Sequence, residues 1–171
     1  MSWTTVPAAG APLRGVVLSS LFSEVRAIRG MNTSDVTVNN STTLVNATGM
    51  AVAVAANKTY HIVGRLEVNG NSTADFRFGF TYPTGLTMRY SALGFNTGGV
   101  YVSLDSIETT TNGFGAGGIA GAGDDIVDIV GTVFVGSTAG TLQVQFAQQV
   151  ADASNTVLRG TGSYIEISER N

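Results

Sequence analysis

The clearest pattern in the sequence is an alternation of apolar and polar residues between Leu142 and Phe146. Apolar residues occupy every second position of this stretch, and glutamines stand between them. A period of two places the apolar side chains on one face of a β-strand and the amides on the other. The stretch is therefore predicted to be a strand with one buried face.

The same period recurs earlier in the chain, from Thr59 to Val68 and from Asp75 to Thr81. In the first of these stretches His61 falls on the polar face. In the second, three phenylalanines share one face, which suits the space between two packed sheets. We expect these three residues to lie inside a sandwich: Phe76, Phe78 and Phe80.

A different pattern runs from Ile129 to Val135, where almost every position is apolar. A strand without a polar face must be covered on both sides, so we expect something besides the chain's own core to cover this one. Turn-forming residues fill 136–140, between this run and the glutamine-bearing strand. They predict a hairpin from Val130 to Gln149.

The N-terminal stretch has a period closer to that of a helix. Residues 2–13 contain two prolines and no periodic pattern, which predicts an extended arm, and Trp3 on that arm is expected to dock either on a neighbouring molecule or on its own domain. From Val17 to Arg29 the apolar residues follow one stripe of a short helix that ends at Gly30. The predicted stripe, which with Trp3 forms the expected anchor and oligomer contact, is Leu18, Leu21, Phe22, Val25 and Ile28.

These patterns together predict an all-β fold. Eight to ten short strands are separated by Gly, Asn and Ser turns, and no helices alternate with them. We therefore expect an antiparallel sandwich of the jelly-roll type, preceded by an N-terminal arm and one short helix. The expected domains are 1–30, the anchor, and 31–171, the β-domain.

The amino-acid composition adds one expectation, which is self-association. The chain of 171 residues is 43% hydrophobic and only 12% charged, with a mean hydropathy of +0.21. That is apolar for a soluble monomer, so burial between subunits is expected. Together with the two-sided strand, it predicts a homotrimer.

Charge and hydropathy also argue against several classes of protein. A net charge of -3 argues against nucleic-acid binding. No run of 18 apolar residues predicts a membrane span, no N-terminal pattern predicts a secretion signal, and there is no cysteine for disulfides or thiolate metal sites.

Candidate chemistry is sparse, and we expect neither an enzyme nor a bound cofactor. Gly113, Gly115 and Gly118 fit the spacing of a dinucleotide-binding loop, but no helix follows them. His61 is the single histidine, so a zinc site built on several imidazoles is excluded. No nucleophile stands at a motif spacing from a base.

The single acidic cluster consists of Asp124, Asp125 and Asp128. Carboxylate oxygens suit calcium, but the spacing is not that of an EF-hand. We interpret these residues as solvated carboxylates at the entry to a strand, and no metal site is predicted.

The helix-bearing start, the run from Thr59 to Gly85 and the run from Ser137 to Arg170 resemble small virion proteins of actinobacterial tailed phages, of the decoration or minor tail kind. Such proteins are similar to the trimeric jelly rolls of the tumour necrosis factor and complement globular-head families. The resemblance implies a homotrimer on the virion surface, made in the host cytoplasm, with phage capsid or tail proteins as partners. An alternative is a receptor-binding tail module whose loops, 93–99 and 108–123, grip a glycan of the host surface.

Overall fold

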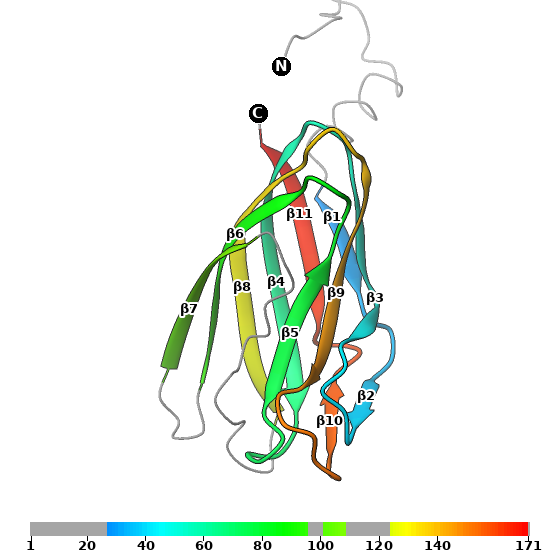
Figure 1. Ribbon diagram of the computed structural model, residues 1–171, viewed down its shortest axis with the longest axis vertical. Helices are drawn as coiled ribbons and strands as arrows, with labels where there is room; N and C mark the ends of the chain where they lie inside the picture. Colours follow the sequence, from blue (N-terminus) through cyan, green and yellow to red (C-terminus); the bar gives the residue numbers. More distant parts are fainter. Residues whose placement is uncertain (1–26, 96–100, 109–123, 171) are drawn as a thin grey trace, which may run out of the picture.

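The computed structural model describes residues 27–95, 101–108 and 124–170, which form two antiparallel β-sheets packed face to face (Figure 1). The larger sheet has eight strands. Six of them follow one another in space in this order: β1 (Ile28–Met31), β11 (Tyr164–Arg170), β4 (Thr59–Asn69), β8 (Asp124–Phe134), β6 (Thr87–Phe95) and β7 (Tyr101–Glu108). The other two extend the sheet, since β10 (Asn155–Leu158) pairs with β4 and β2 (Val36–Asn39) pairs with β10. The smaller sheet contains β3 (Val45–Val54), β9 (Gly140–Gln148) and β5 (Phe76–Thr81). The all-β antiparallel class is thus confirmed, whereas the finer jelly-roll assignment stays a prediction.

The centre of the larger sheet is the pair β4 and β8, which stay in register over their whole length from Thr59 opposite Phe134 to Asn69 opposite Asp124. Every second residue of each strand faces the smaller sheet and is mostly buried. The alternation read from the sequence therefore fixes which side chains enter the core.

The three phenylalanines of β5 lie inside the sandwich, as predicted. Phe76 and Phe78 have no exposed surface and Phe80 retains 3%. The rings of Phe78 and Phe80 meet edge to face with centroids 5.8 Å apart, which is a favourable arrangement of aromatic rings.

The predicted hairpin from Val130 to Gln149 is wrong. The strand β8 pairs with β4 and β6, and β9 pairs with β3 and β5, so residues 135–139 cross from one sheet to the other. Two backbone hydrogen bonds tie this crossing to the turn between β3 and β4: the amide of Val135 donates to the carbonyl of Lys58 and that of Asn57 donates to the carbonyl of Gly136. Turn-forming residues show that a chain reverses, but they do not show whether the next strand joins the same sheet.

The predicted helix is not seen. Its last residues, Ile28 and Arg29, belong to β1, and residues 17–26 lie outside the described ranges. No helix in the described ranges is long and apolar enough to cross a membrane.

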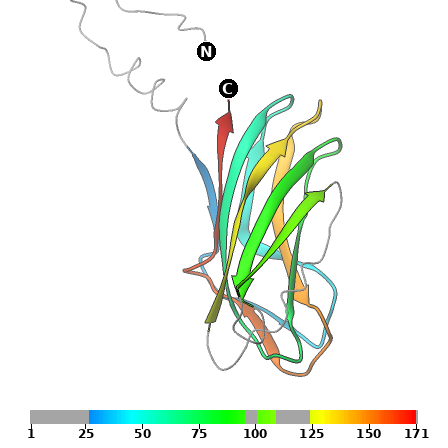
Figure 2. The ribbon, with the colours of Figure 1, turned by 90° about the vertical axis from the view of Figure 1, so that its left-hand side faces the viewer.

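The strand β1 is an integral part of the sheet. It pairs with β11 in the antiparallel sense. Figure 2 shows the two strands side by side, with the last residues of β11 next to the first residues of β1. Gly30 crosses the backbone of β3 so closely that an added Cβ would lie 2.5 Å from the carbonyl oxygen of Ala51. Glycine is required there because any side chain would collide with main-chain atoms.

Candidate interaction surface

The outer face of the larger sheet, turned away from the smaller sheet, carries exposed apolar side chains along β8. Val127, Ile129 and Val133 point inward and are buried, while the outward residues of the same strand are exposed by 40–41%: Ile126, Val130 and Phe134. The strand is apolar on both faces, as its sequence predicted. In a single copy of the chain, these outward apolar side chains are exposed to water.

Neighbouring strands widen this row. Val130 is paired with Val63 of β4 on one side and with Ser91 of β6 on the other, and Leu93 of β6 is paired with Asp128. Val63 and Leu93 are half-buried. We call the five outward apolar residues the β8 strip: Val63, Leu93, Ile126, Val130 and Phe134.

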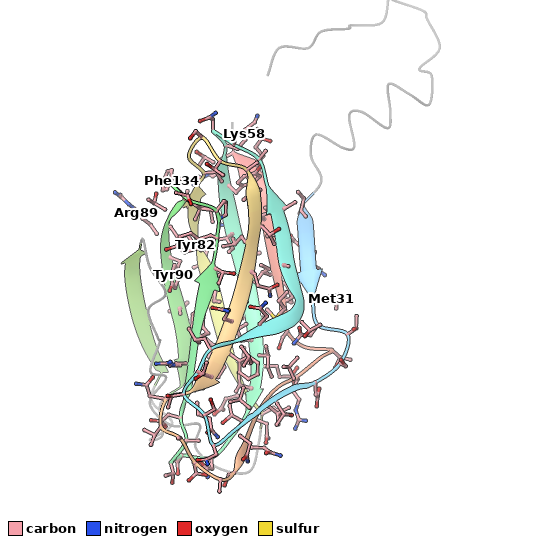
Figure 3. The ribbon with its side chains drawn as sticks, turned by 45° about the vertical axis from the view of Figure 1, so that its right-hand side comes forward. Met31, Lys58, Tyr82, Arg89, Tyr90 and Phe134 are labelled. Atoms are coloured by element: carbon pink, nitrogen blue, oxygen red, sulfur yellow. The ribbon has the colours of Figure 1, made fainter. Side chains whose placement is uncertain are left out.

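Large exposed hydrophobic residues gather on this face. The described residues include seven of them, and four lie on the outer face of the larger sheet: Met31, Ile126, Val130 and Phe134. Figure 3 shows Met31 at one edge of that sheet and Arg89 toward the other, with Phe134 near the end that also carries Lys58. Scattered apolar residues need no explanation, but a gathering on one face indicates an interaction site.

One ion pair interrupts the strip, because Asp128 stands on the outward row of β8 between Ile126 and Val130, and two more lie on its β4 side. Arg65 Nε donates to Asp128 Oδ1 at 2.8 Å, Arg29 lies 2.7 Å from Glu166 and Lys58 lies 2.6 Å from Glu169. The hydrogen bond that Arg65 donates to Asp128 raises the pKa of Arg65, and the one that Lys58 donates to Glu169 raises the pKa of Lys58. Exposed pairs of this kind add little to the stability of a fold. Each pair joins one positive and one negative side chain, so the pairs give the face no dominant charge.

The outer face of the smaller sheet is different in character. Small or polar residues cover it, and its glutamines bond to β3: Gln143 Nε2 donates to the carbonyls of Ala47 and Met50, and Gln145 Nε2 donates to Asn46 Oδ1. These bonds hold the irregularity of β3 between Asn46 and Ala51. The amide face predicted from the sequence is confirmed, and among the described residues it carries no large exposed apolar side chain.

The acidic cluster is divided between two faces. Asp124 points outward and accepts a hydrogen bond from Arg159, Asp128 pairs with Arg65, and Asp125 lies on the inward row, where burial and then the charge of Asp124 raise its pKa. Within residues 27–95, 101–108 and 124–170, no group of three or more His, Cys, Asp or Glu is placed to hold a metal ion. The three carboxylates do not converge on one point, so they do not form a shared site.

His61 lies on the outer face of β4, opposite Thr132 and Ser168, and is half-buried. The polar outward position expected from its sequence is confirmed. Glu166 is held in the ion pair with Arg29.

The sequence-predicted contact residues lie mostly outside the described ranges. This holds for Trp3, Leu18, Leu21, Phe22 and Val25, for the glycine motif and for most of the loop residues expected to bind a glycan. Ile28 is described, and it lies in β1 with 44% of its surface exposed. Ile126 was missed as a surface residue because it precedes the apolar run 129–135, although counting every second position through β8 from Asp124 finds it.

Comparison with known proteins gives no family. No protein-family model matches the sequence, and no curated protein matches it. Among solved structures, the tripod from the baseplate of bacteriophage Tuc2009 matches at 11% identity with a TM-score of 0.34, covering 100% of this chain and 76% of that chain. The infectious bursal disease virus VP2 subviral particle matches at 13% identity and a TM-score of 0.20, covering 84% of this chain and 39% of that chain. At these TM-scores, neither similarity carries an argument about fold or function.

Proposed function

We propose that this chain is a non-enzymatic structural protein of a phage virion, exposed on the particle surface as a homotrimer with a jelly-roll β-domain. The observation that carries the proposal is the gathering of exposed apolar residues on one sheet face, in a chain that is 43% hydrophobic and 12% charged. In an assembly, a neighbouring protein would cover such a face and remove its apolar side chains from water. The sequence resemblance to decoration and minor tail proteins of actinobacterial phages supports the same class, with capsid or tail proteins as partners.

Attachment to the particle is assigned to the residues before β1. The sequence placed the boundary of the anchor at residue 30, but Ile28–Met31 pair with β11, so the proposed anchor ends at residue 26. Its contact residues are Trp3, Leu18, Leu21, Phe22 and Val25.

Electron microscopy of purified particles tests this function. The protein is fused to a small dense label at its C-terminal end, and the label is expected at regular positions on the capsid or the tail. Removing residues 1–26 is expected to abolish the labelling. The proposal fails if the full-length protein does not co-purify with particles.

A further inference from the structure

We propose that the outer face of the larger sheet carries a binding site for a phosphate group at the end where β8 stops. Four side chains form the site, each from a different strand: His61, Arg89, Thr132 and Arg170. It lies beside the apolar residues around Val130. Such a site would give the chain a binding activity beyond the proposed structural role.

Two arginines of this face have no carboxylate partner among the described residues. Ion pairs engage four other cationic side chains: Arg29, Lys58, Arg65 and Arg159. Arg77 lies on the smaller sheet and donates to the carbonyl of Thr42. Arg89 and Arg170 are exposed and form no ion pair with a carboxylate in residues 27–95 or 124–170. Two positive charges on one face are therefore left for an external anion.

These two arginines converge on Thr132. Arg89 of β6 stands directly opposite Thr132 on one side, and His61 of β4 stands opposite it on the other. Directly opposed residues have Cβ atoms about 5 Å apart. Arg170, at the end of β11, reaches across β4, and its Nη1 donates to Thr132 Oγ1 at 3.4 Å. Hydrogen-bond donors from three strands thus surround one hydroxyl.

The donors match the chemistry of a phosphate. A guanidinium binds phosphate oxygens in pairs, and a histidine ring N–H and a threonine hydroxyl are further donors. A phosphate ester has three acceptor oxygens and a charge of about −1.5 to −2, which suits two arginines that approach from opposite sides. A carboxylate has two coplanar oxygens, and one arginine satisfies both. The arrangement therefore favours phosphate.

The surroundings also favour an anion at this end of the face. At the other end of β8, Arg159 is shared between Asp35 and Asp124, so carboxylates outnumber cations there. Such a charge distribution directs an anion toward Arg89 and Arg170. Figure 3 shows Arg89 reaching away from the sheet at the end that carries Phe134. The exposed ring of Phe134 suits contact with the organic part of a phosphate ester.

Calorimetric titration of the full-length protein with inorganic phosphate at low ionic strength tests the site. A dissociation constant on the order of 1 mM is expected from a few charge-assisted hydrogen bonds. Arg89→Gln is expected to weaken binding at least about tenfold. Arg29→Gln is the matched control, because it removes the same charge from the same face where Glu166 already engages it. Its effect is expected to stay below about threefold, and circular dichroism checks that both variants are folded.

Two further probes define the ligand. Acetate is expected to bind at least about tenfold more weakly than phosphate, and equal binding would overturn the choice of phosphate. Glucose 6-phosphate is expected to bind more tightly than inorganic phosphate, with the gain lost in Phe134→Ala. Equal binding of the two phosphates would overturn the contact with Phe134.

The site itself is overturned by either of two results. One is the absence of binding heat up to about 20 mM phosphate. The other is an equal loss of affinity in Arg89→Gln and Arg29→Gln, which would mean that phosphate responds only to the net charge of the face. Neither result bears on the proposed structural role, which the particle labelling tests separately.

Discussion

Phe78 shows most directly how a single residue maintains this sandwich. Its ring is fully buried between Phe76 and Phe80 and faces Tyr90 of the other sheet, 6.2 Å between centroids. We predict that Phe78→Ala lowers the free energy of unfolding by about 3–5 kcal/mol through lost apolar burial and a residual cavity. Chemical denaturation measures the change.

The matched control lies on the same strand. Thr81→Ala alters an exposed outward position of β5 and is expected to change stability by less than about 0.5 kcal/mol. Equal effects of the two substitutions would contradict the assigned inner face of β5.

Asp35 is expected to make the stability of the fold depend on pH. Its carboxylate accepts hydrogen bonds from the amide of Gly160 and from Arg159, both at 2.8 Å, and these contacts lower the pKa of Asp35. A carboxyl whose pKa is lower in the folded state contributes stability above its unfolded pKa and loses it as the pH falls. Its contribution is therefore expected to be full at neutral pH and to be lost progressively as the pH falls below about 4, toward the lower pKa of the folded state.

Asp35→Asn is predicted to lower the melting temperature at pH 7, and to lower it progressively less as the pH falls below about 4. The comparison with the wild-type chain between pH 2 and pH 7 measures both. Parallel melting curves at every pH would show that Asp35 does not contribute in this way.

At the residue scale, the sequence predicted which face of a strand a side chain occupies, but not which distant residue it contacts. A period of two was enough to place Phe76 and Phe80 inward and His61 outward. It could not bring Asp35 and Arg159 together, since 124 positions separate them and the contact exists only after β10 has joined the larger sheet.

At the scale of elements, long strands were predictable and short ones were not. The strand β4 was identified almost to its ends, because eleven residues show their alternation clearly. The strands β1 and β10 have four residues each, too few to show a period, and both were missed. Ile28 was assigned to a helix because its spacing from Val25 continued an apolar stripe, whereas the pairing of β1 with β11 determines its structure.

Two deletions test the position of the boundary. Removing residues 1–26 is predicted to leave the stability of the β-domain unchanged within about 1 kcal/mol. Removing residues 1–31 also deletes β1 and uncovers the buried side chains of Ile165 and Ile167. A loss on the order of 2–4 kcal/mol is expected, since complete exposure of one such side chain costs about 1.5–3 kcal/mol.

Denaturant unfolding of the two truncated proteins measures the difference. Equal stability of both would mean that β1 contributes nothing to the sheet, and would return the boundary to residue 30.

At the scale of the whole molecule, the sequence indicated that a surface needed covering, and the structure identifies the face. Composition and the two-sided strand predicted self-association, but the outward direction of Val130 and its neighbours became clear only with the register of β4, β8 and β6. The crossing of residues 135–139 between the sheets was beyond the sequence, because both strands it joins have an apolar face and would suit either sheet.

The mass of the full-length protein in solution tests the central claim most directly. One chain has a mass of 17.6 kDa, and light scattering at micromolar concentration is predicted to give about 53 kDa, the mass of a closed ring of three copies. A mass of 17.6 kDa at that concentration would contradict the account.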